Sequence, residues 1–264
     1  MQLTNLPPPN LQSIDWLHWF DRWEAMQGAY LPQRQHRFDL MFRLPDFPRD
    51  TELRILDLGC GPGSVAFCAL RHYPNAHIIT VDADPVLLAM GSGLANCELR
   101  ITNQENITFI LADLRDGAWW ADRDSVFDLV VSATALHWLT EAHLAEVYRR
   151  VYRALKPGGW FYNADHIAAD DPAMQTRYRD LLHEWQQANF DAGTEDWDSF
   201  WRGFEAALAQ AGISAQREAI TYWEGTDDGL SRQFHLDTLR ACGFADVAIH
   251  WQDLGEALVG ARKP

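Results

Sequence analysis

The sequence has little positive charge for its length. It contains 22 Lys and Arg against 37 Asp and Glu, which gives a formal net charge of −15. Proteins that bind nucleic acids neutralise phosphates with clustered basic side chains, so this balance argues against a nucleic-acid partner. The clearest basic groups are Arg34/Arg37, Arg149/Arg150/Arg153 and Arg177/Arg179. We interpret each of these groups as part of a solvated helix face.

Cysteines and long apolar runs are also scarce. The four cysteines show no Cys-x-x-Cys spacing, which favours a reducing compartment, and we assign no metal site. The longest apolar stretch, about Leu129–Leu139, is interrupted by polar residues and is too short to cross a bilayer. No charged head followed by an apolar run is visible near Pro7-Pro8-Pro9, so we predict no signal peptide. We therefore expect a cytoplasmic protein without a membrane partner.

Short β-rich runs alternate with helical segments from about residue 54. The expected strands are 54–58, 77–82, 107–112, 127–132 and 159–164. This alternation is typical of a parallel sheet with right-handed crossovers. The clearest amphipathic helix is 141–156, and Lys156-Pro-Gly-Gly159 is expected to end it, because Pro157 cannot continue a helix.

The C-terminus breaks this alternation. Two strand-like runs, Val247–Trp251 and Ala257–Ala261, flank the short turn Asp253-Leu-Gly255. This pattern predicts a hairpin, which would place one antiparallel strand in an otherwise parallel sheet.

Two helical regions are expected outside the sheet of this single domain, 1–264. One is an N-terminal cap at about 11–43, where Trp16, Trp19, Phe20 and Trp23 share a helix face. The other is an insertion at about 170–213, predicted as two helices separated by the acidic turn Asp191–Asp198. The tryptophans could line a pocket, anchor the cap to the domain, or form the surface of a homodimer.

The most informative segment is Arg54–Ser64, in which a buried-strand pattern runs into a loop with glycine at 59, 61 and 63. Glycines allow a ligand to approach the backbone closely. Dinucleotide sites place a pyrophosphate on amides in such a loop, whereas Pro62 removes an N–H and Ser64 occupies the last small-residue position. The loop therefore favours a nucleoside cofactor that carries no phosphate.

Acidic residues follow the next two expected strands. Asp82, which is 23 residues after Gly59, is suited to accept from ribose hydroxyls, whereas Asp84 is expected to cap the helix that begins at Pro85. Asp113 could accept from an adenine amino group beside the apolar Leu114, or could be a turn residue.

The segment Leu56-Asp57-Leu58-Gly59-Cys60-Gly61-Pro62-Gly63 resembles the first motif of class I methyltransferases, which bind S-adenosylmethionine. The segment from Phe127 to Trp138 is similar to the fourth-strand motif of small-molecule members, including those that esterify trans-aconitate. The resemblance implies a Rossmann-like, doubly wound, mostly parallel seven-stranded α/β sheet with a C-terminal antiparallel hairpin. It also implies a cofactor site made of Asp57, Gly59, Cys60, Gly61, Asp82, Ala83, Asp113, Leu114 and Ser132.

The resemblance implies methyl transfer by in-line displacement to a small organic acceptor, namely an amine, a carboxylate or a phenol. A carboxylate needs no base, whereas the other acceptors must lose a proton, for which His137, His166 and Tyr30 are candidates. His137 could equally be a packing residue. The residues expected at the acceptor are Trp19, Tyr30, Trp138 and Trp223.

Two alternatives stay open on the sequence alone. One is an NAD(P)-dependent oxidoreductase, which Pro62, Ser64 and the hairpin disfavour. The other is a non-catalytic protein of methyltransferase fold that acts through a partner.

Overall fold

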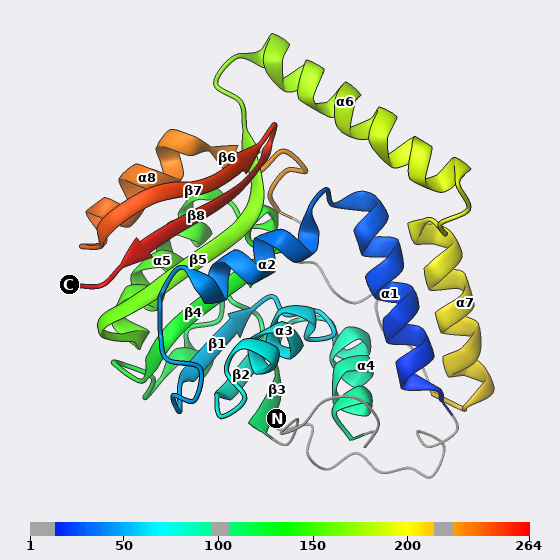
Figure 1. The fold of residues 1–264 in the computed structure, drawn as a ribbon, viewed down its shortest axis with the longest axis horizontal. Helices are drawn as coiled ribbons and strands as arrows, with labels where there is room; N and C mark the ends of the chain where they lie inside the picture. Colours follow the sequence, from blue (N-terminus) through cyan, green and yellow to red (C-terminus); the bar gives the residue numbers. More distant parts are fainter. Residues whose placement is uncertain (1–13, 97–105, 214–223) are drawn as a thin grey trace.

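A single mixed sheet organises the chain, of which the computed structural model describes residues 14–96, 106–213 and 224–264. The strands are β1 (Arg54–Leu58), β2 (His77–Asp82), β3 (Ile107–Leu111), β4 (Phe127–Ala133), β5 (Leu155–Ala168), β6 (Leu230–Ser231), β7 (Ala245–Asp253) and β8 (Glu256–Arg262). Their main order is β3-β2-β1-β4-β5-β8-β7, and the short β6 pairs with β5 off this path (Figure 1). The pairs among β1 to β5 are parallel, whereas β8 is antiparallel to both β5 and β7. The predicted seven-stranded sheet with its antiparallel hairpin is confirmed, and β6 adds one short parallel pairing.

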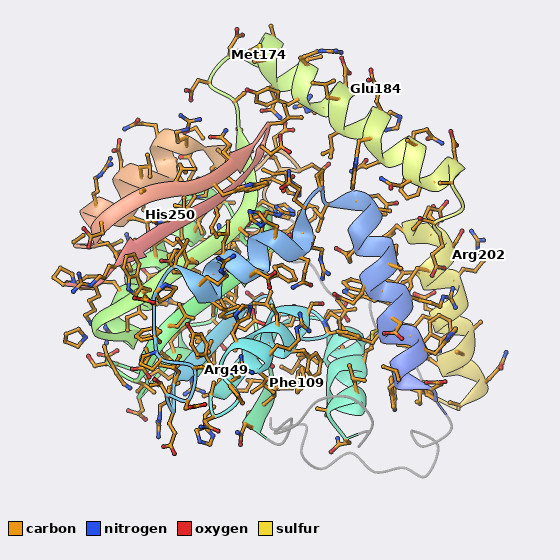
Figure 2. The ribbon with its side chains drawn as sticks, in the orientation of Figure 1. Arg49, Phe109, Met174, Glu184, Arg202 and His250 are labelled. Atoms are coloured by element: carbon orange, nitrogen blue, oxygen red, sulfur yellow. The ribbon has the colours of Figure 1, made fainter. Side chains whose placement is uncertain are left out.

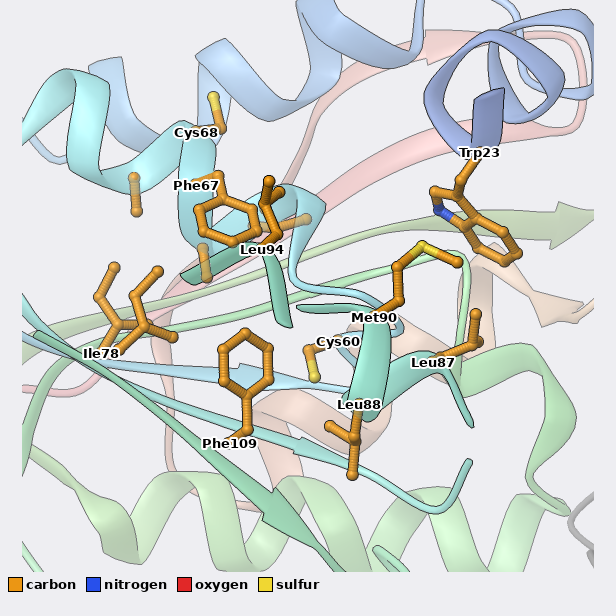
Figure 3. Close-up of a cluster of buried hydrophobic side chains, with 14 of the residues drawn as sticks. Trp23, Cys60, Phe67, Cys68, Ile78, Leu87, Leu88, Met90, Leu94 and Phe109 are labelled. Atoms are coloured by element: carbon orange, nitrogen blue, oxygen red, sulfur yellow. The ribbon is translucent and has the colours of Figure 1, made fainter. Parts of the chain in front are cut away.

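Helices cover both faces of the sheet. They are α1 (Trp16–Tyr30), α2 (Arg34–Arg43), α3 (Ser64–His72), α4 (Pro85–Ala95), α5 (Glu141–Ala154), α6 (Pro172–Asp191), α7 (Trp197–Gln210) and α8 (Arg232–Ala241), with the 3-10 turns η4 (Ala118–Trp120) and η5 (Leu136–Trp138). Because neighbouring residues of a strand point to opposite faces, Ile55 and Val131 pack with α2, α3 and α4, whereas Leu56 and Val130 pack with α5 and α8. Figure 3 shows the first of these cores, where Phe67 and Phe109 meet between α3 and the sheet.

The boundary between α5 and β5 differs from the prediction. The helix ends at Ala154, and β5 already begins at Leu155, which pairs with Phe127 of β4. Lys156-Pro-Gly-Gly159 thus lies within the strand, where Gly158 has a φ of +80°. The physical cause is the pairing with β4, which extends the strand backwards past the glycines.

The N-terminal cap, expected as a helical region at about 11–43, consists of the two helices α1 and α2. Leu31 is extended, Pro32 lacks an amide hydrogen, and Gln33 has a left-handed φ of +52°, so the chain turns between α1 and α2. In contrast, the insertion forms the two predicted helices, α6 and α7. Residues 11–13 lie outside the described residues.

The tryptophans of α1 are buried within the chain. Trp16, Trp19 and Trp23 are each less than a tenth exposed, and Trp19 packs against Phe200 and Phe204 of α7. This agrees with the interpretation that the aromatic face of α1 anchors the cap, whereas Trp185 of the insertion is 36% exposed. No helix in the described parts of the chain is long and apolar enough to cross a bilayer.

By contrast, α6 stands at the edge of the molecule with no buried residue (Figure 1). Figure 2 shows Met174 and Glu184 at its periphery, and Met174 is 44% exposed. Its other face lies over a cleft, with Tyr178, Leu182 and Gln186 at helical spacing.

Candidate active site

A cleft of 1190 Å³ opens at the carboxyl ends of β1 to β5. One side consists of the turns that follow these strands. The opposite side consists of α1, α6, the segment 225–228 and the turn between β7 and β8. Ligand pockets typically have volumes of about 300–1,000 Å³. The cleft therefore has room for a nucleoside cofactor together with a second small molecule.

The glycine loop forms the floor of the cleft next to β1. Gly59, Gly61 and Gly63 all have positive φ angles, which side chains rarely allow. A Cβ atom on Gly59 would lie 2.3 Å from the Cβ of Ala135, so this glycine also permits the β4 turn to approach. Gly59, Cys60 and Gly61 line the cleft, as the sequence predicts for a cofactor loop.

Two acidic residues, Asp82 and Asp57, lie close to this loop. Asp82 accepts from the backbone N–H of Gly61 at 2.7 Å and of Asp84 at 2.8 Å, and it lines the cleft. Burial raises the pKa of Asp82 to about 6. Asp57 is buried, and neither of its carboxylate oxygens has a hydrogen-bond partner among the described residues. Burial, reinforced by the neighbouring Asp82, raises the pKa of Asp57 to about 8.

The predicted division of roles between Asp82 and Asp84 agrees with the geometry. Asp84 is the N-cap of α4 and accepts from the N–H groups of Val86 and Leu87, with Pro85 in the first turn. This leaves Asp82 as the carboxylate that faces the cleft at the end of β2.

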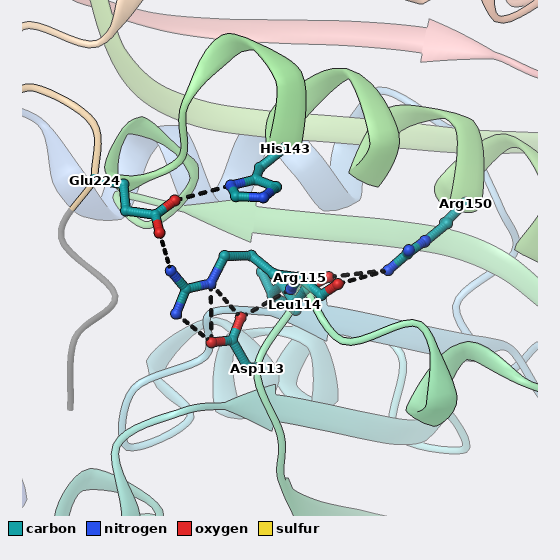
Figure 4. Close-up of polar contacts among 6 residues, drawn as sticks. All are labelled: Asp113, Leu114, Arg115, His143, Arg150 and Glu224. Carbon is teal, nitrogen blue, oxygen red and sulfur yellow. Dashed lines mark hydrogen bonds and ion pairs between the residues drawn. The ribbon is translucent and has the colours of Figure 1, made fainter. Parts of the chain in front are cut away.

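Asp113 lies in the cleft wall but is tied to a neighbouring arginine (Figure 4). Its carboxylate accepts from the Arg115 guanidinium at 2.5 to 3.0 Å and from the Arg115 backbone N–H at 2.8 Å. Arg115 also donates to Glu224, which contacts His143. The Arg115 hydrogen bonds hold the pKa of Asp113 below its ordinary value. The turn interpretation of Asp113 thus describes its contacts, while its place beside Leu114 in the cleft fits the adenine interpretation.

A buried histidine and carboxylate pair lies at the ends of β4 and β5. His137 Nδ1 is 2.7 Å from Asp165 Oδ1, and the His137 backbone N–H donates to Asp165 Oδ2 at 3.1 Å. Both side chains are at most 3% exposed, and His137 lines the cleft. Burial opposes ionisation of Asp165, but His137 and His166 outweigh it and hold the pKa of Asp165 below its ordinary value. Because Nδ1 faces Asp165, Nε2 is the ring atom of His137 left for the cleft.

His166 adds a second imidazole, whose ring centre is 4.7 Å from that of His137. It forms an ion pair with Glu256, and Glu256 also pairs with Arg37. Burial opposes protonation of His166, but Glu256 outweighs it and raises the pKa of the imidazole. His166 and Glu256 both line the cleft.

The remaining predicted residues divide between the cleft and the core. Tyr30 and Trp138 line the cleft, as do Ala83 and Leu114. The Tyr30 hydroxyl accepts from the backbone N–H of Trp197, so it already has a structural partner. Trp19 packs between α1 and α7 and does not line the cleft, which corrects its predicted place at the acceptor.

Ser132 also lies outside the observed cleft wall. Ser132 is fully buried, and its hydroxyl donates to the Leu58 carbonyl, so this residue joins β4 to β1 behind the cofactor loop. Trp223 lies outside the described residues.

Three residues that contact the two histidines or their partners were missed from the sequence, namely Asp165, Glu256 and Arg37. Arg37 is 1% exposed, although its sequence pattern predicts a solvated helix face. A weak signal did exist for Asp165, because it directly precedes His166 at the end of a strand, where a carboxylate can reach a ligand. No local pattern indicated that Arg37 and Glu256, which are 219 positions apart, would meet.

Comparison with known proteins agrees with this fold. Residues 55–159 match a family model described as a methyltransferase domain. The chain is 35% identical over 172 residues to trans-aconitate 2-methyltransferase from Streptomyces avermitilis, covering 61% of this chain and 60% of that relative. It is 30% identical over 135 residues to carboxy-S-adenosyl-L-methionine synthase from Geobacter metallireducens, covering 50% of this chain and 52% of the relative. The aligned parts thus span little more than half the length of these relatives.

The fold has similar solved structures. Human N-acetylserotonin methyltransferase in complex with S-adenosylmethionine has a TM-score of 0.54 at 17% identity, covering 98% of this chain and 60% of that one. The sheet order is that of class I S-adenosylmethionine-dependent methyltransferases, and residues 55–159 match a methyltransferase domain. The chain is homologous to small-molecule methyltransferases such as the trans-aconitate enzymes. These similarities give no support to the NAD(P)-dependent oxidoreductase alternative.

Proposed function

We propose that the protein transfers a methyl group from S-adenosylmethionine to a small organic acceptor whose nucleophilic atom must first lose a proton. The observation that carries this proposal is the His137–Asp165 pair, which opens onto the same cleft as the glycine loop. A base oriented by a buried carboxylate is of use only where a proton is removed. The His137–Asp165 pair therefore favours an enzyme over the alternative of a non-catalytic protein.

The described residues fit this cofactor. Asp82 keeps lone pairs for ribose hydroxyls, and the glycine loop exposes backbone to a ligand without phosphate. Arg34 lies in the cleft wall and donates to Glu24 at 2.7 and 3.0 Å, while Glu24 accepts from Ser64 at the start of α3. We assign this group of three side chains to the amino-acid end of the cofactor, because it lies beside the glycine loop and carries both charges.

The cofactor supplies its own activation, since its sulfonium is a good leaving group for an attacking nucleophile. The chain therefore has to orient the acceptor, exclude water and accept a proton. His137 Nε2 is placed to accept that proton, while Asp165 holds the ring through Nδ1 and stabilises the imidazolium that results.

Production of S-adenosylhomocysteine tests the proposal. Purified protein is incubated with S-adenosylmethionine and a panel of amines, phenols and carboxylates, and the homocysteine product is measured by mass spectrometry. We expect turnover with at least one class of acceptor and its loss in the His137→Gln variant. Product formation that is equal in wild type and variant would contradict the role of the histidine pair.

We also propose a cytoplasmic location. The three described cysteines, Cys60, Cys68 and Cys242, are free thiols, which fits a reducing compartment.

A further inference from the structure

The basic side chains beside the cleft are already paired. Arg34 and Arg179 are the lysine or arginine residues that line it among the described residues. Arg34 is bound to Glu24 through both terminal nitrogens. Arg179 is bound to Asp228 through two nitrogens, one of them at 2.7 Å. Recognition of a di- or tricarboxylate depends on such guanidinium groups, so an anionic acceptor would have to compete with the protein's own carboxylates.

Two carboxylates on the same wall form no ion pair with the described residues. Asp253 belongs to the turn between β7 and β8, and it accepts from the neutral amide of Gln33 at 3.3 Å. Asp227 lies between Gly225 and Gly229, where an added Cβ would come within 2.2 Å of the backbone oxygens of His137 and His166. Both aspartates thus belong to loops that reach the two histidines. This part of the cleft carries unbalanced negative charge.

The buried base gives a second and independent indication. His137 is only 5% exposed, and its Nε2 has no partner among the described residues, although the residue lines the cleft. A carboxylate acceptor is already ionised at neutral pH and gains nothing from a base, whereas an ammonium group must lose a proton before it can attack. Aromatic side chains line the same cleft, including Trp23, Tyr30 and Tyr178, and their faces attract cations.

We infer that the acceptor is an organic amine, bound as its cation by Asp227 and Asp253, and not a polycarboxylate. This inference rests on the proposed methyltransferase function. In the step, an N–H proton of the ammonium group passes to His137 Nε2, and the freed nitrogen lone pair forms the N–CH3 bond. The carbon–sulfur bond breaks at the same time, and its electron pair stays on sulfur, which becomes the thioether of S-adenosylhomocysteine.

Matched sets of small molecules test this inference with the intact protein. Each set has one carbon skeleton, either phenylethyl or indolylethyl, and carries an amine, an alcohol or a carboxylate; trans-aconitate is added as a separate compound. Binding to the protein saturated with S-adenosylhomocysteine is measured by calorimetry, and methyl transfer is measured with labelled S-adenosylmethionine. We expect the amine to bind about tenfold or more tightly than the carboxylate of its set, as one charge-assisted contact implies.

The outcomes separate this inference from the proposed function. Tighter binding or faster methylation of the carboxylates or trans-aconitate would overturn the amine assignment while leaving methyl transfer intact. The amine assignment is also overturned if the alcohols are preferred, or if no amine binds to protein that does bind S-adenosylhomocysteine. Failure to bind S-adenosylhomocysteine at all would instead overturn the proposed function.

A double variant and a control variant test which residues bind the amine. The double variant Asp227→Asn/Asp253→Asn should weaken amine binding about tenfold and leave binding of S-adenosylhomocysteine and of the neutral alcohols unchanged. The matched control is Asp246→Asn, an exposed carboxylate of β7 that pairs with Arg262 away from the cleft. Equal affinity of the double variant and the control for the amine would overturn the assigned role of the two aspartates.

Discussion

The two ends of the cleft are built in different ways. The cofactor end is made of turns that directly follow β1, β2 and β3, and backbone groups and glycine conformations define much of it. The acceptor end is made of side chains from α1, α6, η5, β5 and β8, such as His137, Asp165 and Glu256. A site made by backbone depends on local sequence, whereas a site made by distant side chains depends on the whole fold. The first end can therefore be shared across a family while the second determines the acceptor.

The largest expected effect comes from removal of the proposed base, which should lower turnover while leaving cofactor affinity almost unchanged. We expect His137→Gln to lower kcat by about 10² to 10⁴, the range typical of general bases, and to change the dissociation constant of S-adenosylhomocysteine less than about threefold. Steady-state kinetics and calorimetry measure the two quantities. Asp165→Asn should lower kcat in the same direction, because an amide in its place no longer fixes the proton on Nδ1. A comparable loss of cofactor affinity in both variants would show that the ends are not separable.

A variant at the cofactor end should have the opposite effect, weakening cofactor affinity while leaving turnover almost unchanged. Asp82→Asn should weaken binding of S-adenosylhomocysteine about 10- to 100-fold, because hydrogen bonds to a charged acceptor contribute about 1.5–3 kcal/mol. At saturating cofactor, kcat should stay within a fewfold of wild type. Calorimetry and kinetics on the same preparation measure both effects. The prediction fails if kcat falls while affinity is retained.

Alanine variants of two glycines, one near each end of the cleft, should have smaller effects that can be compared directly. A Cβ on Gly91 of α4 would lie 2.4 Å from the Pro62 carbonyl, and a Cβ on Gly225 would lie 1.9 Å from the His137 carbonyl. Each Ala variant should lose about 1–3 kcal/mol of stability, as overpacking does. Gly91→Ala should also weaken cofactor binding, whereas Gly225→Ala should mainly lower kcat.

Denaturant titration, calorimetry and kinetics measure these effects. Gly28→Ala of α1 is the matched control, since nothing beyond the neighbouring backbone lies within 4 Å of its added Cβ. This change should raise stability by about 0.5–1 kcal/mol, as alanine does in a helix, and leave cofactor affinity and kcat unchanged. Equal effects of Gly91→Ala and Gly225→Ala on cofactor affinity would contradict the division of the cleft.

A further expected effect is a pH dependence of stability that comes from Asp57. Its folded-state pKa is raised to about 8 from 3.8, so ionisation is harder in the folded protein than in the unfolded chain. The stability that depends on protonated Asp57 is thus present below the unfolded pKa and is lost as pH rises toward 8. The melting temperature of Asp57→Asn minus that of wild type should therefore rise between about pH 4 and pH 8. A difference that is constant with pH would contradict the buried, unpartnered state of this carboxylate.

The same division explains what the sequence could predict. The strand positions, the hairpin, the cofactor loop and the cap role of Asp84 follow from local patterns, because glycine, proline and alternating apolar residues act on their own neighbours. Arg37 and Glu256 could not be assigned, since their pairing exists only after α2 and β8 have packed together. The predicted place of Trp19 at the acceptor was wrong, because a helical aromatic stripe predicts that a side chain is buried but not which element covers it. In the structure that element is α7.

The central claim is that the cleft binds S-adenosylmethionine through its glycine-loop end, and calorimetric titration of the wild-type protein tests it most directly. We predict binding of S-adenosylhomocysteine with one site per chain, and no heat of binding with NADH under the same conditions. Preference for NADH, or absence of S-adenosylhomocysteine binding by protein that circular dichroism shows to be folded, would contradict this claim.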